Sequence, residues 1–273
     1  MNLNPAMIAA ADDFIIREPD NEYREQARDN LSSHQLGDFR KCPTLYHKKK
    51  LGIIPDQDRP AYLVGRAAHT LILEGGKVFE DAYAIGGPIN PRTGNPFGSN
   101  TKAYAEWADA QGKPVLTDSQ FDLVTQLAAA VKAHEKAYPF LTDGMPEGVV
   151  RMEYCGVQCQ TRMDWFSNER GIVDLKTCDD LTWFESDARR YGYAHQMAFY
   201  RAVLEEISGT TFPVHIIAVE KKEPFRCGVW RVGEDVLGIA QKGNEEAIAH
   251  LKFCQERDQW PTGYEDIRVF DWL

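Results

Sequence analysis

The feature that most constrains the fold is a change in hydrophobic period about halfway along the chain. Apolar residues at 121, 124, 127, 128 and 131 form one helical stripe. Three strand-like runs then follow one another, GVVRMEYCGV, QCQTRMDWF and RGIVDLKT, joined by short turns. Consecutive strands with short connections predict an antiparallel three-stranded meander.

The segment before this meander carries the start and stop signals of several helices. Serine and threonine are good helix N-caps, proline is favoured in the first helical turn, and glycine often ends a helix. Turn-forming residues fill 86–100, which predicts a mobile loop. The predicted helices begin at Ser32 or Ser33, near Pro60, near residue 101 and at Thr117, which has capping-box spacing to Gln120; Pro43 and Gly75 end the first two.

The segment after the meander returns to helical spacing and then alternates again. A long helix is expected over about 182–207, with Tyr193, Met197 and Tyr200 on one face. FPVHIIAVE predicts a buried strand, FRCGVWRV an edge strand, and about 234–258 a closing helix. This order predicts an α/β (α+β) fold with a mixed central sheet flanked by helices.

The predicted domain organisation is simple. Residues 1–30 are polar and acidic and form an N-terminal arm, while 31–273 form a single domain. Within that domain, residues 31–147 are the helical portion and 148–273 the sheet core.

Charged side chains interrupt the otherwise apolar meander. Residues two apart on a strand share a face, so Asp174 and Lys176 point together, as do Arg162 and Asp164. Across the hairpin, we expect Glu153 to lie alongside Asp164. Such a group of carboxylates suits Mg²⁺ or Mn²⁺, hard cations that prefer oxygen ligands.

Lys176 gives this predicted site its chemistry. An ammonium group two residues from a metal-binding aspartate can hold or deprotonate a water molecule in line with a scissile phosphate. The pattern therefore indicates metal-assisted phosphodiester hydrolysis. The alternative is a structural Asp–Lys pair at a sheet edge, since D-x-K is short enough to occur by chance.

Composition limits the other function classes. A net charge of −10 disfavours a general nucleic-acid binder, although a basic patch such as RKCPTLYHKKK can line a cleft. We expect a cytoplasmic protein without a membrane association, because no apolar run approaches the ~20 residues that span a bilayer and the start lacks a basic signal region. The six cysteines form no CxxC pair, so we expect no iron–sulfur cluster. Cys155 and Cys159 are buried or strand thiols, or part of a metal site.

Several motifs in order resemble a known nuclease group. Asp164 is followed after nine residues by DLK, ahead of a long helix. LSSHQLGDFRKCP is similar to the L-S-x-S-x-L…CP opening of the group, GRAAH to its G-x-x-x-H motif, and QMAFY to its Q-x-x-x-Y motif. Together they resemble the PD-(D/E)xK nuclease core, and within it the RecE-type exonucleases (exodeoxyribonuclease VIII), related to the RecB nuclease domain and λ exonuclease. His34 stands where that opening motif has its second serine.

The resemblance implies roles for individual residues. His69, Asp164, Asp174 and the backbone carbonyl of Leu175 would ligate the metal, and Glu153 would bind a second metal or position its water. Lys176 would orient or activate the nucleophilic water. Gln196 and Tyr200 would contact the DNA backbone, with Ser32, Ser33, His34 and Arg162 as further DNA-binding residues. Without the resemblance, the sequence predicts that His69 is a core histidine and that Tyr200 is a packing residue.

The resemblance also implies an activity and partners. It implies a Mg²⁺-dependent exonuclease that degrades linear duplex DNA from 5′ to 3′, with Mn²⁺ able to substitute. The 3′ overhang would pass to a single-strand annealing protein of the RecT/Redβ type. The helical portion would bind DNA ends, and the chain would form a trimeric or tetrameric ring in a bacterial cytoplasm, encoded by a phage or prophage. A structure- or sequence-specific endonuclease and a non-catalytic DNA-end-binding protein remain alternatives.

Overall fold

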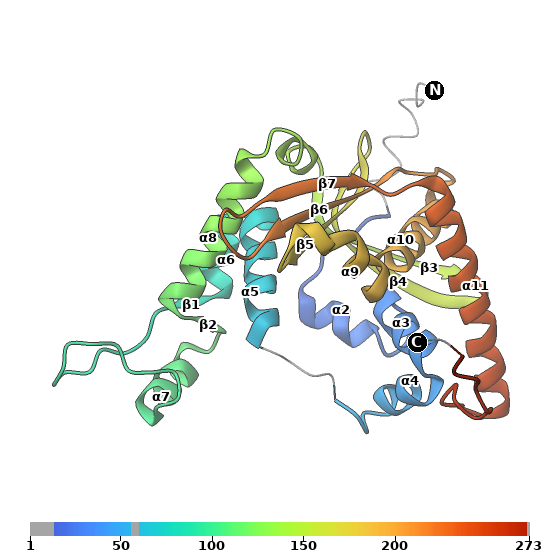
Figure 1. The fold of residues 1–273 in the computed structure, drawn as a ribbon, viewed down its shortest axis with the longest axis horizontal. Helices are drawn as coiled ribbons and strands as arrows, with labels where there is room; N and C mark the ends of the chain where they lie inside the picture. Colours follow the sequence, from blue (N-terminus) through green and yellow to red (C-terminus); the bar gives the residue numbers. More distant parts are fainter. Residues whose placement is uncertain (1–13, 56–59, 272–273) are drawn as a thin grey trace.

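The computed structural model describes residues 14–55 and 60–271, and a five-stranded mixed sheet lies at its centre (Figure 1). The strand order follows the chain, and all neighbours are antiparallel except β5 and β6, which are parallel. The predicted meander and mixed sheet are therefore confirmed. The strands are β3 (Met145–Tyr154), β4 (Val157–Ser167), β5 (Gly171–Cys178), β6 (Val214–Glu220) and β7 (Cys227–Arg231).

Helices cover both faces of the sheet and give two hydrophobic cores. On β5, Val173 and Leu175 pack into the core formed with α5 and α8, whereas Ile172 packs into the core with α10 and α11. This alternation follows from the two-residue period of a strand. The helices are α2 (Asp20–Gln26), α3 (Ser33–Lys41), α4 (Pro43–Lys50), α5 (Pro60–His69), α6 (Gly76–Ala82), α7 (Lys102–Gln111), α8 (Asp118–Ala133), α9 (Phe184–Tyr191), α10 (Tyr193–Ser208) and α11 (Glu234–Arg257).

Shorter elements complete the chain. The π-helix η1 (Thr70–Glu74) continues α5, and the 3₁₀ turns η2 (Tyr138–Leu141) and η3 (Leu181–Trp183) precede β3 and α9. Two residues of β1 (Ala84–Ile85) pair in parallel with β2 (Val115–Leu116). Residues 86–100 contain no helix or strand and extend from the body together with α7 (Figure 1).

The predicted helix starts are found where side chains cap the backbone. Ser32 caps α3 and Thr117 caps α8, each in a reciprocal capping box with Gln35 and Gln120 respectively. Such a box satisfies two backbone N–H groups that a helix start otherwise leaves unpaired. Pro43 ends α3, as expected, and also occupies the first turn of α4.

The single long helix expected over 182–207 is wrong. Gly192 has a φ of +74°, in the left-handed region, and divides this stretch into α9 and α10. An L-residue pays a steric penalty at such a φ, which glycine avoids. The residues on both sides of Gly192 line the largest described cleft of about 930 Å³.

The N-terminal arm lies against the sheet as far as it is described. Residues 1–13 of the predicted arm lie outside the described residues, and Ile16 forms a β-bridge with Val149.

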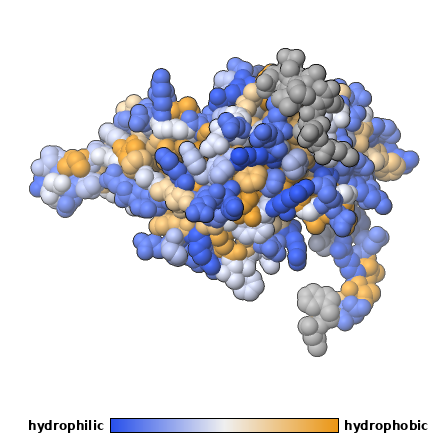
Figure 2. All heavy atoms as spheres, turned by 90° about the horizontal axis from the view of Figure 1, so that it is seen from above, coloured by the Kyte–Doolittle hydropathy of each residue, from blue (hydrophilic) through white to orange (hydrophobic). Residues whose placement is uncertain are grey.

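Hydrophilic side chains dominate the surface seen in Figure 2. Among residues 14–55 and 60–271, none of the helices combines the length and apolarity needed to cross a bilayer.

Candidate active site

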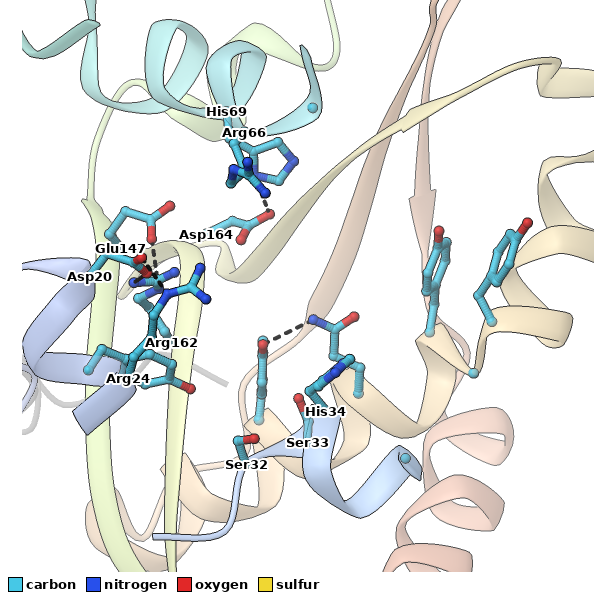
Figure 3. Close-up of a pocket in the computed structure, with 18 of the residues that line it drawn as sticks. Asp20, Arg24, Ser32, Ser33, His34, Arg66, His69, Glu147, Arg162 and Asp164 are labelled. Carbon is cyan, nitrogen blue, oxygen red and sulfur yellow. Dashed lines mark hydrogen bonds and ion pairs between the residues drawn. The ribbon is translucent and has the colours of Figure 1, made fainter. Parts of the chain in front are cut away.

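The site lies in a cleft of about 930 Å³ between the arm, α3, α5 and the start of α10. Figure 3 shows its residues pointing inward from these separate elements. The lining has more basic than acidic side chains, although the whole chain is acidic. The basic members are Arg17, Arg24, Arg40, Lys41, Arg66, Arg162, Arg189 and Arg190; the acidic members are Glu18, Asp20, Asp38, Glu74, Glu147 and Asp164.

Strand register places the two predicted aspartates side by side. Trp165 pairs with Val173, so Asp164 on β4 neighbours Asp174 on β5. Asp164 Oδ2 accepts the backbone N–H of Leu175 at 2.7 Å. On β5, Lys176 Nζ lies 2.6 Å from Asp174 Oδ2, as expected for residues that share a strand face. The ammonium group also lies 4.9 Å from the centre of the Tyr193 ring.

His69 reaches this pair from the end of α5. Its Nδ1 lies 3.5 Å from Asp164 Oδ2. The backbone of Leu175 also interacts with the imidazole. The structure thus brings together His69, Asp164, Asp174, Lys176 and the Leu175 backbone, five of the positions named from the sequence.

The expectation that Glu153 lies alongside Asp164 is wrong. Glu153 pairs with Gln158 near the tip of the β3–β4 hairpin and is exposed. Pro146 pairs with Trp165 and Gly148 with Met163, which leaves Glu147 opposite Asp164. Glu147 therefore supplies the carboxylate that was assigned to Glu153.

A signal for Glu147 was present in the sequence. Tyr154 pairs with Val157, so Cys155 and Gly156 form a two-residue turn, and both have positive φ (53° and 73°). A residue followed by glycine is typical of such turns. Counting back from this turn pairs position 164 with 147, whereas the alternation rule alone leaves the register open.

Burial and mutual repulsion set the protonation of the cluster. Burial, with the neighbouring charge of Asp164, raises the pKa of Glu147 to about 8 and that of Asp174 to about 6. Burial and the nearby Lys176 ammonium lower the pKa of His69 to about 4. Burial opposes the charge of Lys176, but Asp174 and Asp164 outweigh it and raise the pKa of Lys176 above its ordinary value. Buried carboxylates that repel one another favour a bound cation.

The donor set fits a divalent metal ion. One ligand atom each from His69, Glu147 and Asp164 lies within 4.8 Å of the others. Asp174 Oδ1 is buried without a hydrogen-bond partner, while its Oδ2 faces Lys176. A buried carboxylate oxygen that lacks a partner is costly unless a cation or donor reaches it. Carboxylate oxygens with one imidazole suit Mg²⁺ and especially Mn²⁺.

The other predicted DNA-contacting residues line the same cleft. Gln196 Nε2 donates to Tyr200 Oη at 3.0 Å, and Tyr200 is buried at the floor while remaining part of the lining. Ser32, Ser33 and His34 lie at the start of α3 (Figure 3). The Ser32 hydroxyl is committed to its helix cap, whereas His34 is exposed. Arg162 also lines the cleft, but two carboxylates contact it.

Fold and site together define the class. A mixed sheet that carries Asp164, Asp174 and Lys176 on adjacent strands, with helices on both faces, is the core of the PD-(D/E)xK nuclease superfamily. The chain belongs to the family described as PDDEXK-like domain of unknown function (DUF3799), whose model matches residues 32–271.

A solved structure is similar in fold. The crystal structure of a protein from Eubacterium rectale, described as a "putative exonuclease", superimposes with a TM-score of 0.69. The match covers 94% of this chain and 96% of that chain at 16% sequence identity, so it establishes the fold alone. No curated protein matches the chain.

Proposed function

We propose that this protein is a Mg²⁺-dependent exonuclease acting on the ends of linear double-stranded DNA. The observation that carries the proposal is Asp164, which lines a cleft rich in arginine, with Asp174 beside it on β5 and Lys176 2.6 Å from Asp174. Arginines around a carboxylate cluster suit a phosphodiester substrate, because they attract the phosphates while the carboxylates hold a cation.

Each residue has a defined task in this proposal. A bound Mg²⁺ would supply Lewis-acid stabilisation of charge on the phosphate. Asp164, Asp174, Glu147 and His69 would hold the ion, and the Leu175 N–H fixes the Asp164 carboxylate in place. Lys176, which contacts Asp174 at 2.6 Å and whose pKa is raised by the two aspartates, would orient the attacking water as an ammonium group. Gln196 and Tyr200 contact the DNA backbone beside the scissile phosphate.

The finer assignment is a RecE-type recombination enzyme. It degrades one strand from 5′ to 3′, and the 3′ overhang passes to a single-strand annealing protein. Residues 31–147 bind the DNA end, and three or four copies form a ring around the duplex. The ordered motifs support this assignment, because the helix that begins after Ser32, His69 at the end of α5 and the Gln196–Tyr200 pair on α10 all line one cleft.

The primary test compares Asp174→Ala with a matched variant. Asp179→Ala removes an exposed aspartate just beyond the end of the same strand. We expect wild type and Asp179→Ala to degrade linear duplex with Mg²⁺, and EDTA or Asp174→Ala to abolish degradation. Digestion by Asp174→Ala at the wild-type rate would show that the site is assigned wrongly.

Three further measurements separate the alternatives and test the polarity and the assembly. An exonuclease leaves covalently closed circular DNA intact, whereas an endonuclease cuts it, and a non-catalytic end-binding protein releases no nucleotides from either. Duplexes labelled at the 5′ or 3′ end report polarity, with early loss of the 5′ label expected. Light scattering should give three or four times the 30.9 kDa protomer mass; a monomeric mass contradicts the ring.

A further inference from the structure

The guanidinium group of Arg162 is held on several sides inside the cleft. Its Nε lies 3.0 Å from Glu147 Oε2, and its Nη1 donates to Asp20 Oδ1 at 2.7 Å. The ring of Tyr23 lies beneath it, with 4.6 Å between the guanidinium carbon and the ring centre. Arg162 therefore joins a candidate metal ligand on β3 to two residues of the N-terminal arm.

The arm is fixed to the sheet independently of these contacts. The Ile16 N–H donates to the Val149 carbonyl at 2.9 Å, and the return bond measures 2.8 Å. Arg151 Nη1 donates to Glu18 Oε2 at 3.0 Å, and Gln160 Nε2 donates to the Tyr23 carbonyl at 3.1 Å. These bonds hold Asp20 and Tyr23 over β4, and several arm residues line the cleft (Figure 3).

Glu147 needs an external group to stay in place. It has a φ of 55°, in the left-handed region, and its carboxylate lies near that of Asp164. Two carboxylates that lie close together repel, and the interaction grows stronger as water is excluded. Arg162 is a cation that contacts Glu147, at 3.0 Å.

The arm itself lies outside the region that defines the family. The matched region starts at residue 32, whereas Asp20 and Tyr23 precede it. Two of the groups that hold Arg162 are thus supplied by a segment to which the family model assigns nothing.

We propose that the N-terminal arm completes the nuclease site: Asp20 and Tyr23 hold Arg162 against Glu147, so that the Glu147 carboxylate stays beside Asp164 where a divalent ion binds. This inference rests on the proposed function. Asp20, Tyr23 and Arg162 are positioning residues in it, because none of them belongs to the candidate ligand group of His69, Glu147 and Asp164. Arg162 is also predicted from the sequence to bind DNA, and two edges of its guanidinium contact carboxylates.

The test measures Mn²⁺ affinity in the full-length protein without DNA, by the loss of the free-ion signal in electron paramagnetic resonance. Groups that orient metal ligands typically contribute 10- to 100-fold in metal affinity. We expect Asp20→Asn and Tyr23→Leu to weaken Mn²⁺ binding about 10-fold, and Tyr23→Phe, which keeps the ring, to bind as wild type does.

A matched control lies in the same helical turn. Glu22→Gln makes the same charge change in the first turn of α2, at an exposed position. We expect Glu22→Gln to keep wild-type affinity, and Asp20→Asn to add no further loss in a Glu147→Gln background. Thermal melting of each variant establishes that the fold is intact.

The contrary outcomes are distinguishable. If Glu147→Gln weakens Mn²⁺ binding but Asp20→Asn does not, or if Glu22→Gln weakens it equally, the arm does not position Glu147. If Glu147→Gln binds Mn²⁺ as tightly as wild type, the proposed metal site is wrong, and so is the positioning role of the arm.

Discussion

At the scale of single residues, burial gives the carboxylates of the cleft their chemistry. Asp174 is fully buried and Asp164 is mostly buried, and Lys176 contacts Asp174 at 2.6 Å. A carboxylate in such surroundings is stabilised by a bound ion much more than one on the surface. Metal binding and catalysis should therefore respond sharply to changes at these few positions.

Glu147 and Glu153 provide a direct comparison of two acidic residues on one strand. We expect Glu147→Gln to lower the nuclease kcat at least about 100-fold, since it removes a charge from the metal-binding group. Groups that only orient metal ligands already contribute about 10-fold or more to metal affinity or activity. Glu153→Gln should stay within about twofold of wild type, because Glu153 is exposed at the hairpin tip. Single-turnover cleavage of linear duplex measures both. A large loss from Glu153→Gln would contradict the register described here.

A second residue-scale prediction concerns pH and stability away from the cleft. The Glu220 side chain is buried, and Arg226 donates a hydrogen bond to each of its carboxylate oxygens, at 2.7 and 2.6 Å. These bonds lower the pKa of Glu220 below its ordinary value of 4.5. A lowered folded-state pKa stabilises the protein above the unfolded-state pKa, and this contribution is lost as pH falls through the folded-state value. We expect Glu220→Gln to cost about 1–3 kcal/mol of unfolding free energy at pH 7. The difference from wild type should shrink below about pH 4.5 in urea titrations; a difference that grows on acidification has the wrong sign.

The residues of the site could be predicted where their geometry depends on a single strand. They could not be predicted where two strands had to be aligned. Asp174 and Lys176 share a face because they lie two apart on β5, which needs no partner strand. Glu147 depends on the β3–β4 register, which the Cys155–Gly156 turn determines. The contacts of Arg162 with Asp20 and Tyr23 join segments about 140 residues apart in the chain, beyond the reach of any local pattern.

At the scale of elements, local signals predicted helix starts and strands well. The N-cap residue Ser32 and the capping-box spacing of Thr117 predicted the starts of α3 and α8, and the strand-like runs predicted the five strands of the sheet. The missed features lack a strong periodic signal. They include the short α6 and the two-residue ladder of β1 and β2, which are too short to show a hydrophobic period.

Gly192 is the element-scale feature with a testable energy. It has a φ of +74° between α9 and α10, and an added Cβ would lie 3.5 Å from Arg40 Nη2. An L-residue in the left-handed region costs about 1–2 kcal/mol, so we expect Gly192→Ala to lower the unfolding free energy by about that amount. Tyr193 and Gln196 follow directly on α10 and line the cleft, so DNA binding should weaken as well.

A glycine of ordinary helical conformation is the control. Gly238 lies inside α11, and no atom lies within 4 Å of an added Cβ. We expect Gly238→Ala to stabilise the protein by about 0.5–1 kcal/mol, since alanine is the better helix former. Chemical denaturation measures the unfolding free energy of both variants. Equal effects of the two substitutions would contradict a conformational requirement for glycine at position 192.

At the scale of the whole molecule, charge is distributed unevenly. The chain carries a net charge of −10, yet basic side chains outnumber acidic ones around the cleft. An acidic exterior repels DNA, so the cleft is where a duplex meets a favourable field. This arrangement makes an acidic protein compatible with the proposed DNA substrate.

The salt dependence of DNA binding tests that distribution. Each phosphate neutralised by a basic side chain adds about 0.9 to the slope of log affinity against log salt concentration. Arg189 and Arg190 are exposed at the cleft, so we expect Arg189→Gln with Arg190→Gln to weaken binding of a linear duplex and to reduce the slope by about 2. Lys242→Gln, at an exposed position of α11 outside the cleft lining, should leave the slope unchanged. Fluorescence anisotropy in Ca²⁺, measured from about 50 to about 200 mM NaCl, gives the slope for each variant. If Lys242→Gln reduces the slope as much as the double variant, the duplex binds outside the cleft, and the carboxylates of Asp164 and Asp174 are not where its phosphates lie.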